Sequence, residues 1–102
     1  MEMENYTTTT IEKSKDLKDV NLRLAGLITD AFHGVNQRGN GYCKFTLQDY
    51  DGSETYNLYN ESYKKFNSLI HPGEVIFLEG TYSRGFNSDN YFFRIILDPG
   101  IL

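Results

Sequence analysis

One segment is the only convincing helix in a chain that otherwise has the pattern of β-strands. It spans residues 60–73, NESYKKFNSLIHPG. Asn60 is a favourable N-cap residue, because its side chain can accept a hydrogen bond from a free backbone N–H of the first turn. Pro72 and Gly73 are typical of a helix end. The apolar residues between them recur at helical spacing and would form one stripe: Tyr63, Phe66, Leu69 and Ile70. The segment therefore predicts one short amphipathic helix.

Strand-like runs flank this helix, three before it and two after it. Their alternation of apolar and polar residues is typical of strands with one buried face. We predict strands over residues 20–32, 42–49, 54–59, 74–84 and 91–97. A helix between the third and fourth of five strands is the order of an OB-fold. The expected fold class is therefore all-β, a five-stranded OB-fold Greek-key barrel with one α-helix between strands 3 and 4. A small SH3-like barrel is the competing fold, and the helix position favours the OB-fold.

Length and composition predict one domain. The chain has 102 residues, of which 39% are hydrophobic and 15% aromatic, enough for a packed interior. Residues 1–19 show no periodicity, so we expect a leader or linker that is partly disordered, followed by an OB-fold domain at residues 20–102. Such a leader suggests a fragment of a longer chain or a mobile arm. The polar, acidic start and the lack of a long apolar run predict a cytoplasmic protein with no membrane contact.

The chemistry-bearing residues argue against an enzyme. No nucleophile, metal-ligand or phosphate-binding motif is present, so we expect this chain alone to have no catalytic activity, no metal and no cofactor. The single Cys43 excludes an internal disulfide and a cysteine-based zinc site. We expect Cys43 to face the core and to be inert. Asp49 precedes a predicted turn, where we expect it to accept backbone N–H groups.

A binding face is predicted on the outer positions of strands two and three and in the two long loops. The candidate nucleic-acid-binding residues on strands are Arg23, Tyr42, Lys44, Asn57 and Tyr59. The candidates in or beside the loops are Phe32, His33, Arg38, Arg84 and Phe86. Alternative roles stay open for three of these residues. Tyr59 could instead fill the end of the barrel. Lys44 and Arg23 could instead form cross-strand ion pairs with carboxylates.

The net charge of −4 argues against tight binding of phosphates. Stacking on aromatic side chains remains compatible with weak binding, because it needs no net positive charge. The residues therefore predict weak binding of single-stranded nucleic acid without sequence preference.

Three stretches of the chain resemble a known family. They are LRLAGLIT, FTLQDYDGS and NLYNESYKKFNSLIHPGEVIFLEGTYSR. Together they resemble the OB-fold nucleic-acid-binding domain of the bacterial DNA polymerase III alpha subunit. The positions that match the family pattern are Ala25, Gly26, Leu27, Ile28, Thr46, Leu47, Asp49, Gly52, Tyr59, Glu61, Tyr63, Lys65, Phe66, Gly73, Glu74, Gly80 and Arg84.

The resemblance implies a non-catalytic accessory module of a replicative polymerase that contacts single-stranded template DNA. The parent protein would be a DNA-directed DNA polymerase, a nucleotidyltransferase, with its active site in other domains. The first long loop departs from the family pattern, since Arg38 is its only Lys or Arg. Two alternatives therefore stay open. One is a protein-interaction OB module that binds other replisome proteins, and the other is an anticodon-type RNA-binding OB domain.

Overall fold

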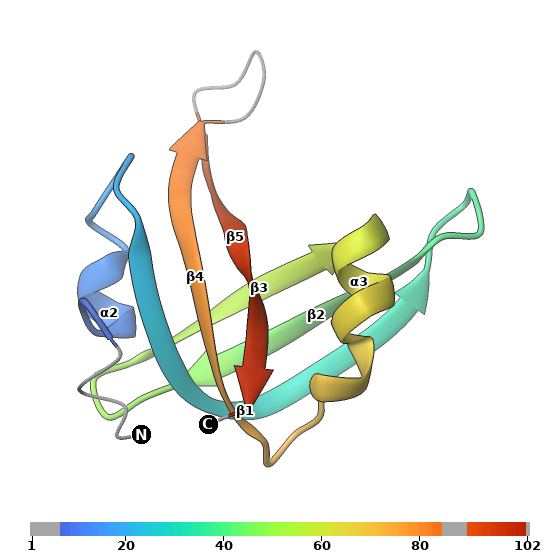
Figure 1. The fold of residues 1–102 in the computed structure, drawn as a ribbon, viewed down its shortest axis with the longest axis horizontal. Coiled ribbons are helices and arrows are strands. Elements are labelled where there is room, and N and C mark those ends of the chain that lie inside the picture. The colour runs from blue at the N-terminus through green and yellow to red at the C-terminus, as the bar shows by residue number, and fades with distance from the viewer. Residues whose placement is uncertain (1–6, 85–89, 102) are drawn as a thin grey trace.

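Five antiparallel strands form one sheet in the order β3-β2-β1-β4-β5 in this computed structural model, which describes residues 7–84 and 90–101. The strands are β1 (Leu22–Val35), β2 (Gly41–Gln48), β3 (Ser53–Tyr59), β4 (Val75–Arg84) and β5 (Tyr91–Ile101). The helices are α2 (Ile11–Ser14), α3 (Asn60–Phe66) and the 3-10 helix η1 (Asn67–Leu69). The sheet curls into a half-barrel, with α2 and α3 at opposite ends (Figure 1). The predicted order of five strands, with a helix between the third and fourth, is confirmed.

The sheet is curved because strand β1 bends along its length. Its first half pairs with β4 and its second half with β2, with a register shift between Ile28 and Asp30. Such a bulge bends a strand and exchanges which residues face inward. Gly26 lies at the crossover, where an added Cβ would stand 2.5 Å from the backbone oxygen of Gln48. This close approach of the two backbones leaves no room for a side chain at position 26.

The core lies inside the curl. Alternate residues of β2 and β3 are buried, among them Cys43, Phe45 and Leu58, as their pattern predicted. Ile11 of α2 and Ile70 after η1 are each 0% exposed and belong to the same cluster. One continuous core therefore extends from one helix to the other. No helix within the described residues is long and apolar enough to cross a membrane.

The predicted N-cap of α3 is wrong. Asn60 is the first residue of the helix, with φ at 53°, and Tyr59 holds the N-cap position without a side-chain hydrogen bond. Strand β3 passes into the helix without a loop, so Asn60 makes the corner, and asparagine tolerates positive φ better than most residues. The apolar stripe is confirmed in part, because Tyr63 and Phe66 pack against the core and Ile70 belongs to it. The helix is shorter than predicted, since α3 ends at Phe66 and η1 follows it, and Leu69 is not in the core cluster.

Two strands are longer than predicted. β1 continues to Val35, so Phe32 and His33 lie in the strand and the loop shrinks to residues 36–40. β5 continues past Pro99 to Ile101, although the sequence predicted its end at residue 97. The register shift opposite this stretch leaves room for Pro99 in an edge strand, because residues at a bulge need not donate to the ladder.

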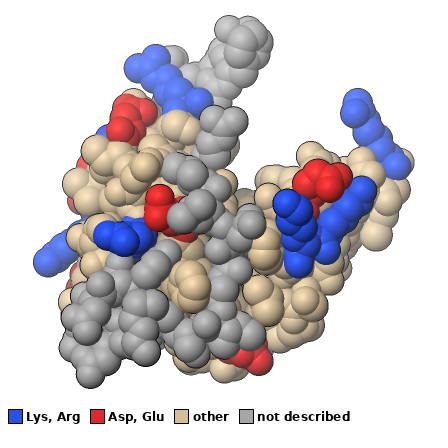
Figure 2. Space-filling view, viewed as in Figure 1, with Lys and Arg blue, Asp and Glu red and all other residues tan. Residues whose placement is uncertain are grey.

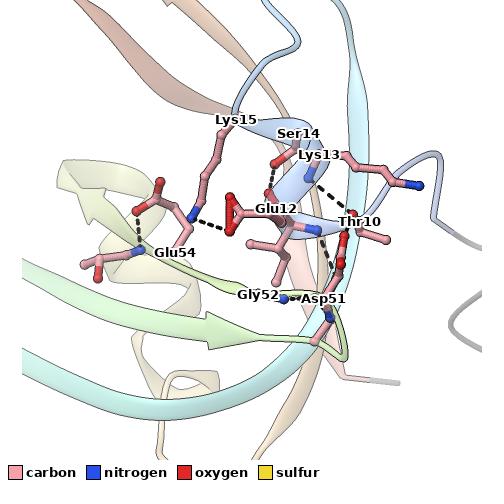
Figure 3. Close-up of polar contacts among 11 residues, drawn as sticks. Thr10, Glu12, Lys13, Ser14, Lys15, Asp51, Gly52 and Glu54 are labelled. Atoms are coloured by element: carbon pink, nitrogen blue, oxygen red, sulfur yellow. Dashed lines mark hydrogen bonds and ion pairs between the residues drawn. The ribbon is translucent and has the colours of Figure 1, made fainter.

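Part of the N-terminal segment is fixed to the sheet. Figure 3 shows the first turn of α2 against the β2–β3 turn, where the Thr10 hydroxyl donates to Asp51 over 2.6 Å. The backbone N–H of Thr8 donates to the carbonyl of Arg23 over 3.0 Å. The sequence did not predict α2, because four residues are too few for a periodic signal. The predicted leader covered residues 1–19, of which residues 1–6 lie outside the described part of the chain.

Candidate nucleic-acid interface

Three aromatic side chains form a row across β1, β2 and β3 on the face opposite the core. Their rings are those of Phe32, Tyr42 and Tyr59. The Phe32 and Tyr42 ring centroids are 6.2 Å apart, and those of Tyr42 and Tyr59 are 6.4 Å apart with 26° between the planes. Phe32 is 58% exposed and Tyr59 56% exposed, while Tyr42 between them is half-buried. The structure therefore brings together three candidates from separate parts of the sequence, and the exposure of Tyr59 argues against its role as a plug.

Gly34 makes room for this row. It stands directly opposite Tyr42 in the β1–β2 ladder. An added Cβ at Gly34 would lie 2.9 Å from the ring of Phe32 and 2.9 Å from that of Tyr42. A side chain here would push the two rings, so the approach of Phe32 and Tyr42 depends on glycine. Nothing in the local sequence singles out Gly34, because its importance depends on the register between β1 and β2.

Lys44 and Asn57 complete this surface. In the strand register, Lys44 lies opposite Phe32 of β1 on one side and opposite Asn57 of β3 on the other. Lys44 is exposed and makes no ion pair within the described residues, so its ammonium group is available to a phosphate. The side-chain oxygen of Asn57 is buried and has no hydrogen-bond partner among the described residues. We call these five residues the outer-face cluster: Phe32, Tyr42, Lys44, Asn57 and Tyr59.

Arg38 lies in the loop beside this cluster, between the strands that carry Phe32 and Tyr42. The loop is held by Asn36, whose side-chain oxygen accepts from the backbone N–H groups of Arg38 (2.9 Å) and Asn40 (3.0 Å). Gly39 adopts φ of 83°, which favours glycine. The Arg38 side chain is exposed. This fixed turn presents one cation at the end of the cluster.

Three other described candidates do not join the cluster. Arg23 lies nine residues before Phe32 on β1 and is paired in register with Glu79 of β4. Arg84 ends β4, with its guanidinium group 6.0 Å from the ring centre of Tyr91. Phe86 lies outside the described residues. The third described candidate, His33, is on the other face of β1, opposite Cys43.

His33 connects β1 to α3. Its Nε2 lies 2.9 Å from the carbonyl oxygen of Ile70, and its Nδ1 lies 3.1 Å from the hydroxyl of Tyr63. A carbonyl only accepts, so Nε2 donates to Ile70, and Nδ1 shares the second hydrogen bond with the Tyr63 hydroxyl. The histidine therefore helps to hold the helix on the sheet. It was predicted in a loop because the bulge in β1 cannot be read from the local pattern.

Charge is mixed over the helix. Figure 2 shows basic and acidic side chains together over α3. Lys64 and Glu61 form an exposed pair with 3.5 Å between nitrogen and oxygen, which matches the solvated face expected for this side of the helix. Within the described residues, no group of three His, Cys, Asp or Glu side chains is placed to hold a metal ion.

Comparison with known proteins supports the fold. No protein-family model matches the chain, and no curated protein matches it in sequence. Solved structures do match. The hypothetical protein ygiW from E. coli superimposes with a TM-score of 0.60 and 18% identity over 92% of this chain and 88% of that one.

A second solved structure is an OB-fold by its description. It is the second OB-fold domain of replication protein A from Methanococcus maripaludis, with a TM-score of 0.60 and 15% identity over 92% of this chain and 95% of that one. At these identities the likeness concerns the fold alone. The chain therefore has the OB-fold predicted from its sequence, and the competing SH3-like barrel is set aside.

Proposed function

We propose that this chain is a non-catalytic OB-fold module that binds single-stranded DNA weakly through the outer-face cluster. The observation that supports it best is the exposed row of Phe32, Tyr42 and Tyr59, which offers ring faces to successive bases. Every base has a π-face, so such a row tolerates any sequence. Lys44 beside the row and Arg38 at its end supply the cations for phosphates. A similar fold occurs in a replication protein A domain, which is consistent with this use.

The expected affinity follows from these few contacts. Stacking contributes about 1–3 kcal/mol per base, and only two rings of the row are well exposed. Two stacked bases and one or two phosphate contacts correspond to a dissociation constant on the order of 10 μM to 1 mM. The net charge of −4 acts against accumulation of DNA at the surface. Binding should therefore be detectable at low salt and weaken as salt increases.

Fluorescence anisotropy with a labelled thymidine 12-mer at low salt tests the proposal. Tyr59→Ala should weaken binding by about 5- to 150-fold, the range that corresponds to one lost stacking contact. Tyr50→Ala is the matched control, because Tyr50 is 90% exposed in the β2–β3 turn and lies outside the cluster. Absence of saturable binding to the wild-type protein at millimolar concentration would contradict the proposal.

RNA is the alternative ligand for the same surface. A comparison of deoxyuridine and uridine 12-mers isolates the 2′-hydroxyl, which is the group that lets a protein tell RNA from DNA. A clear preference for the uridine oligomer would favour the RNA-binding alternative. Equal or stronger binding of the deoxyuridine oligomer supports the single-stranded DNA proposal.

The narrower proposal is that the module serves a replicative polymerase and its replisome partners. It rests on the motif resemblance to the DNA polymerase III alpha subunit, centred on residues 57–84, and the comparisons add nothing to it. A pull-down from nuclease-treated extract tests it, because contacts that survive nuclease do not run through DNA. Capture of polymerase III subunits by the wild-type protein supports it. Capture of none contradicts it and leaves the proposal for single-stranded DNA unaffected.

A further inference from the structure

The half-barrel has an open side between its two edge strands. β3 and β5 are the ends of the sheet order, so no described strand pairs with their outer edges. The groove between these edges has a volume of about 850 Å³ and is lined by β3, by the end of β4 and by the start of β5. This volume lies in the range of sites that enclose a ligand, which is about 300–1,000 Å³.

The backbone of β3 directs hydrogen-bonding groups into this groove. The backbone N–H of Thr55 donates to the side chain of Glu54 over 2.9 Å and not to β2. The hydroxyls of Thr55 and Thr46, which stand opposite each other, are 3.1 Å apart, as expected for a non-hydrogen-bonded pair of an antiparallel ladder. Such pairs alternate along a strand, so the N–H and C=O of Asn57 also point away from β2. These groups have the spacing that an added strand needs.

Of the two edges, β3 has fewer of the features that normally prevent pairing with another chain. Its ladder with β2 runs from Ser53 to Tyr59 without a register shift, and it contains no proline and one charged residue, Glu54. β5 contains Pro99 and has register shifts against β4. Prolines, bulges and charges are the usual protection of an edge strand. The β3 edge is therefore the one that is open to strand addition.

The floor of the groove is apolar and only partly covered. Phe93 and Ile95 of β5 pack against the core, yet both are half-buried and line the groove. The Phe93 ring centroid is 4.9 Å from that of Tyr56 on β3. Apolar side chains from an occupant would remove this remaining surface from water, which is favourable. A nucleic-acid backbone fits less well, because Glu54 places a carboxylate in the groove.

The two edges run in the same direction. Each neighbouring pair in the sheet is antiparallel, so β3, β1 and β5 share one direction. One strand of the opposite direction is therefore antiparallel to both edges, which is the more stable kind of pairing. We propose that the groove takes an extended segment of a partner protein as a sixth strand, with apolar side chains toward Phe93 and Ile95. This interaction goes beyond the proposed DNA binding and does not depend on it.

The register defines which groups of the added strand pair with β3. Its residue opposite Asn57 has its side chain on the outer face, as Asn57 has, and directs its own N–H toward β3. The inward-facing residues direct theirs toward β5. β3 has seven residues, so a segment of similar length matches it. A suitable probe is a heptapeptide of alternating threonine and valine, with valine as the inward residue and a lysine added at each end for solubility.

Fluorescence anisotropy with this labelled peptide tests the proposal. Methylation of the threonine amide nitrogens should weaken binding at least about 5-fold, the lower limit for two lost hydrogen bonds. Thr55→Pro removes one β3 donor that the β2 ladder does not use, and should weaken binding of the unmethylated peptide about 3- to 10-fold. Thr55→Val, which keeps the backbone N–H, should bind the peptide as wild type does. Circular dichroism checks that both variants keep the fold.

Backbone amide NMR supplies the second readout. The peptide should shift the signals of Asn57 and Phe93, which lie on the two sides of the groove. Absence of saturable binding at millimolar peptide, or equal binding of the methylated peptide, overturns the proposal and leaves the DNA proposal unaffected. Sedimentation equilibrium that shows a dimer of the wild-type protein, dissociated by Thr55→Pro, would assign the edge to a second copy. Shifts of Phe93 with a thymidine 12-mer but not with the peptide would assign the groove to nucleic acid.

Discussion

The carboxylate of Asp49, at the end of β2, accepts a hydrogen bond of 2.9 Å from the backbone N–H of Ile11, 38 residues earlier in the chain. Its other oxygen accepts from the backbone N–H groups of Asp51 (2.9 Å) and Gly52 (3.0 Å). The predicted role of Asp49 in the turn is confirmed. The bond to Ile11 adds a second role, because it places the first residue of α2 so that the Ile11 side chain enters the core.

Asp49→Ala should lower the free energy of unfolding by about 2–4 kcal/mol, because three backbone donors lose a charged acceptor. Urea denaturation followed by circular dichroism measures the change. Asp16→Ala is the control, since Asp16 is exposed and its side chain makes no hydrogen bond within the described residues. A loss below about 0.5 kcal/mol for Asp49→Ala, the size expected for a plain surface change, would contradict the role given to the carboxylate.

Ile11→Ala should cost about 2–5 kcal/mol, the range for truncating a fully buried aliphatic side chain. Leu17→Ala serves as the comparison, because Leu17 is 39% exposed and its loss should cost under about 1 kcal/mol. The same urea experiment distinguishes a mobile leader from a segment that completes the core. A chain that starts at Val20, where the sequence predicted the domain to begin, lacks Ile11 and should be destabilised at least as much. Equal stability of that shorter chain and the full chain would support the predicted domain boundary at residue 20.

Gly34→Ala should weaken binding to single-stranded DNA by about 3- to 10-fold, since the new methyl group displaces the rings of Phe32 and Tyr42 and costs part of one stacking contact. Anisotropy measures this change, and urea denaturation checks that the fold is kept. Gly39→Ala is not a suitable control because of its positive φ. Ser68→Ala is better, because Ser68 is exposed after α3 and remote from the cluster in sequence and strand order. Unchanged binding by Gly34→Ala would show that the close approach of the Phe32 and Tyr42 rings does not contribute to DNA binding.

Local sequence patterns predicted the features that depend on neighbouring residues, namely the strands and their buried faces. The alternation of Cys43, Phe45 and Leu47 predicted both a strand and its buried face, because one buried side of a sheet imposes a period of two. The features that were missed depend on pairing between distant segments. The bulge after Ile28 decides that Phe32 faces outward and His33 inward, and nothing near it in sequence indicates this.

The sequence predicted which residues form the candidate site better than it predicted how those residues are arranged. Aromatic residues on the outer positions of β2 and β3 followed from the strand pattern, so Tyr42 and Tyr59 were found. Gly34 was not, because its role depends on the register between β1 and β2.

Cys43 gives a test of the core that depends on pH. Burial raises the pKa of its thiol to about 11, whereas the unfolded thiol has a pKa near 9. Between these values the unfolded chain loses a proton that the folded chain keeps, so the free energy of unfolding should fall as pH rises from about 9 to about 11. The loss at pH 10.5 should be about 2 kcal/mol, following about 1.4 kcal/mol per unit.

Urea denaturation of wild type and Cys43→Ala between pH 7 and pH 10.5 isolates this contribution. Burial also raises the pKa of Tyr56 and Tyr82, so both proteins should lose stability above about pH 10, and the wild type should lose more. Iodoacetamide gives an independent check at pH 8, because the thiolate is the reactive form. Folded protein should react far more slowly than protein in urea. Parallel stability curves for the two proteins, or equal alkylation rates, would place the thiol in contact with water, and the inward face of β2 would then need to be reassigned.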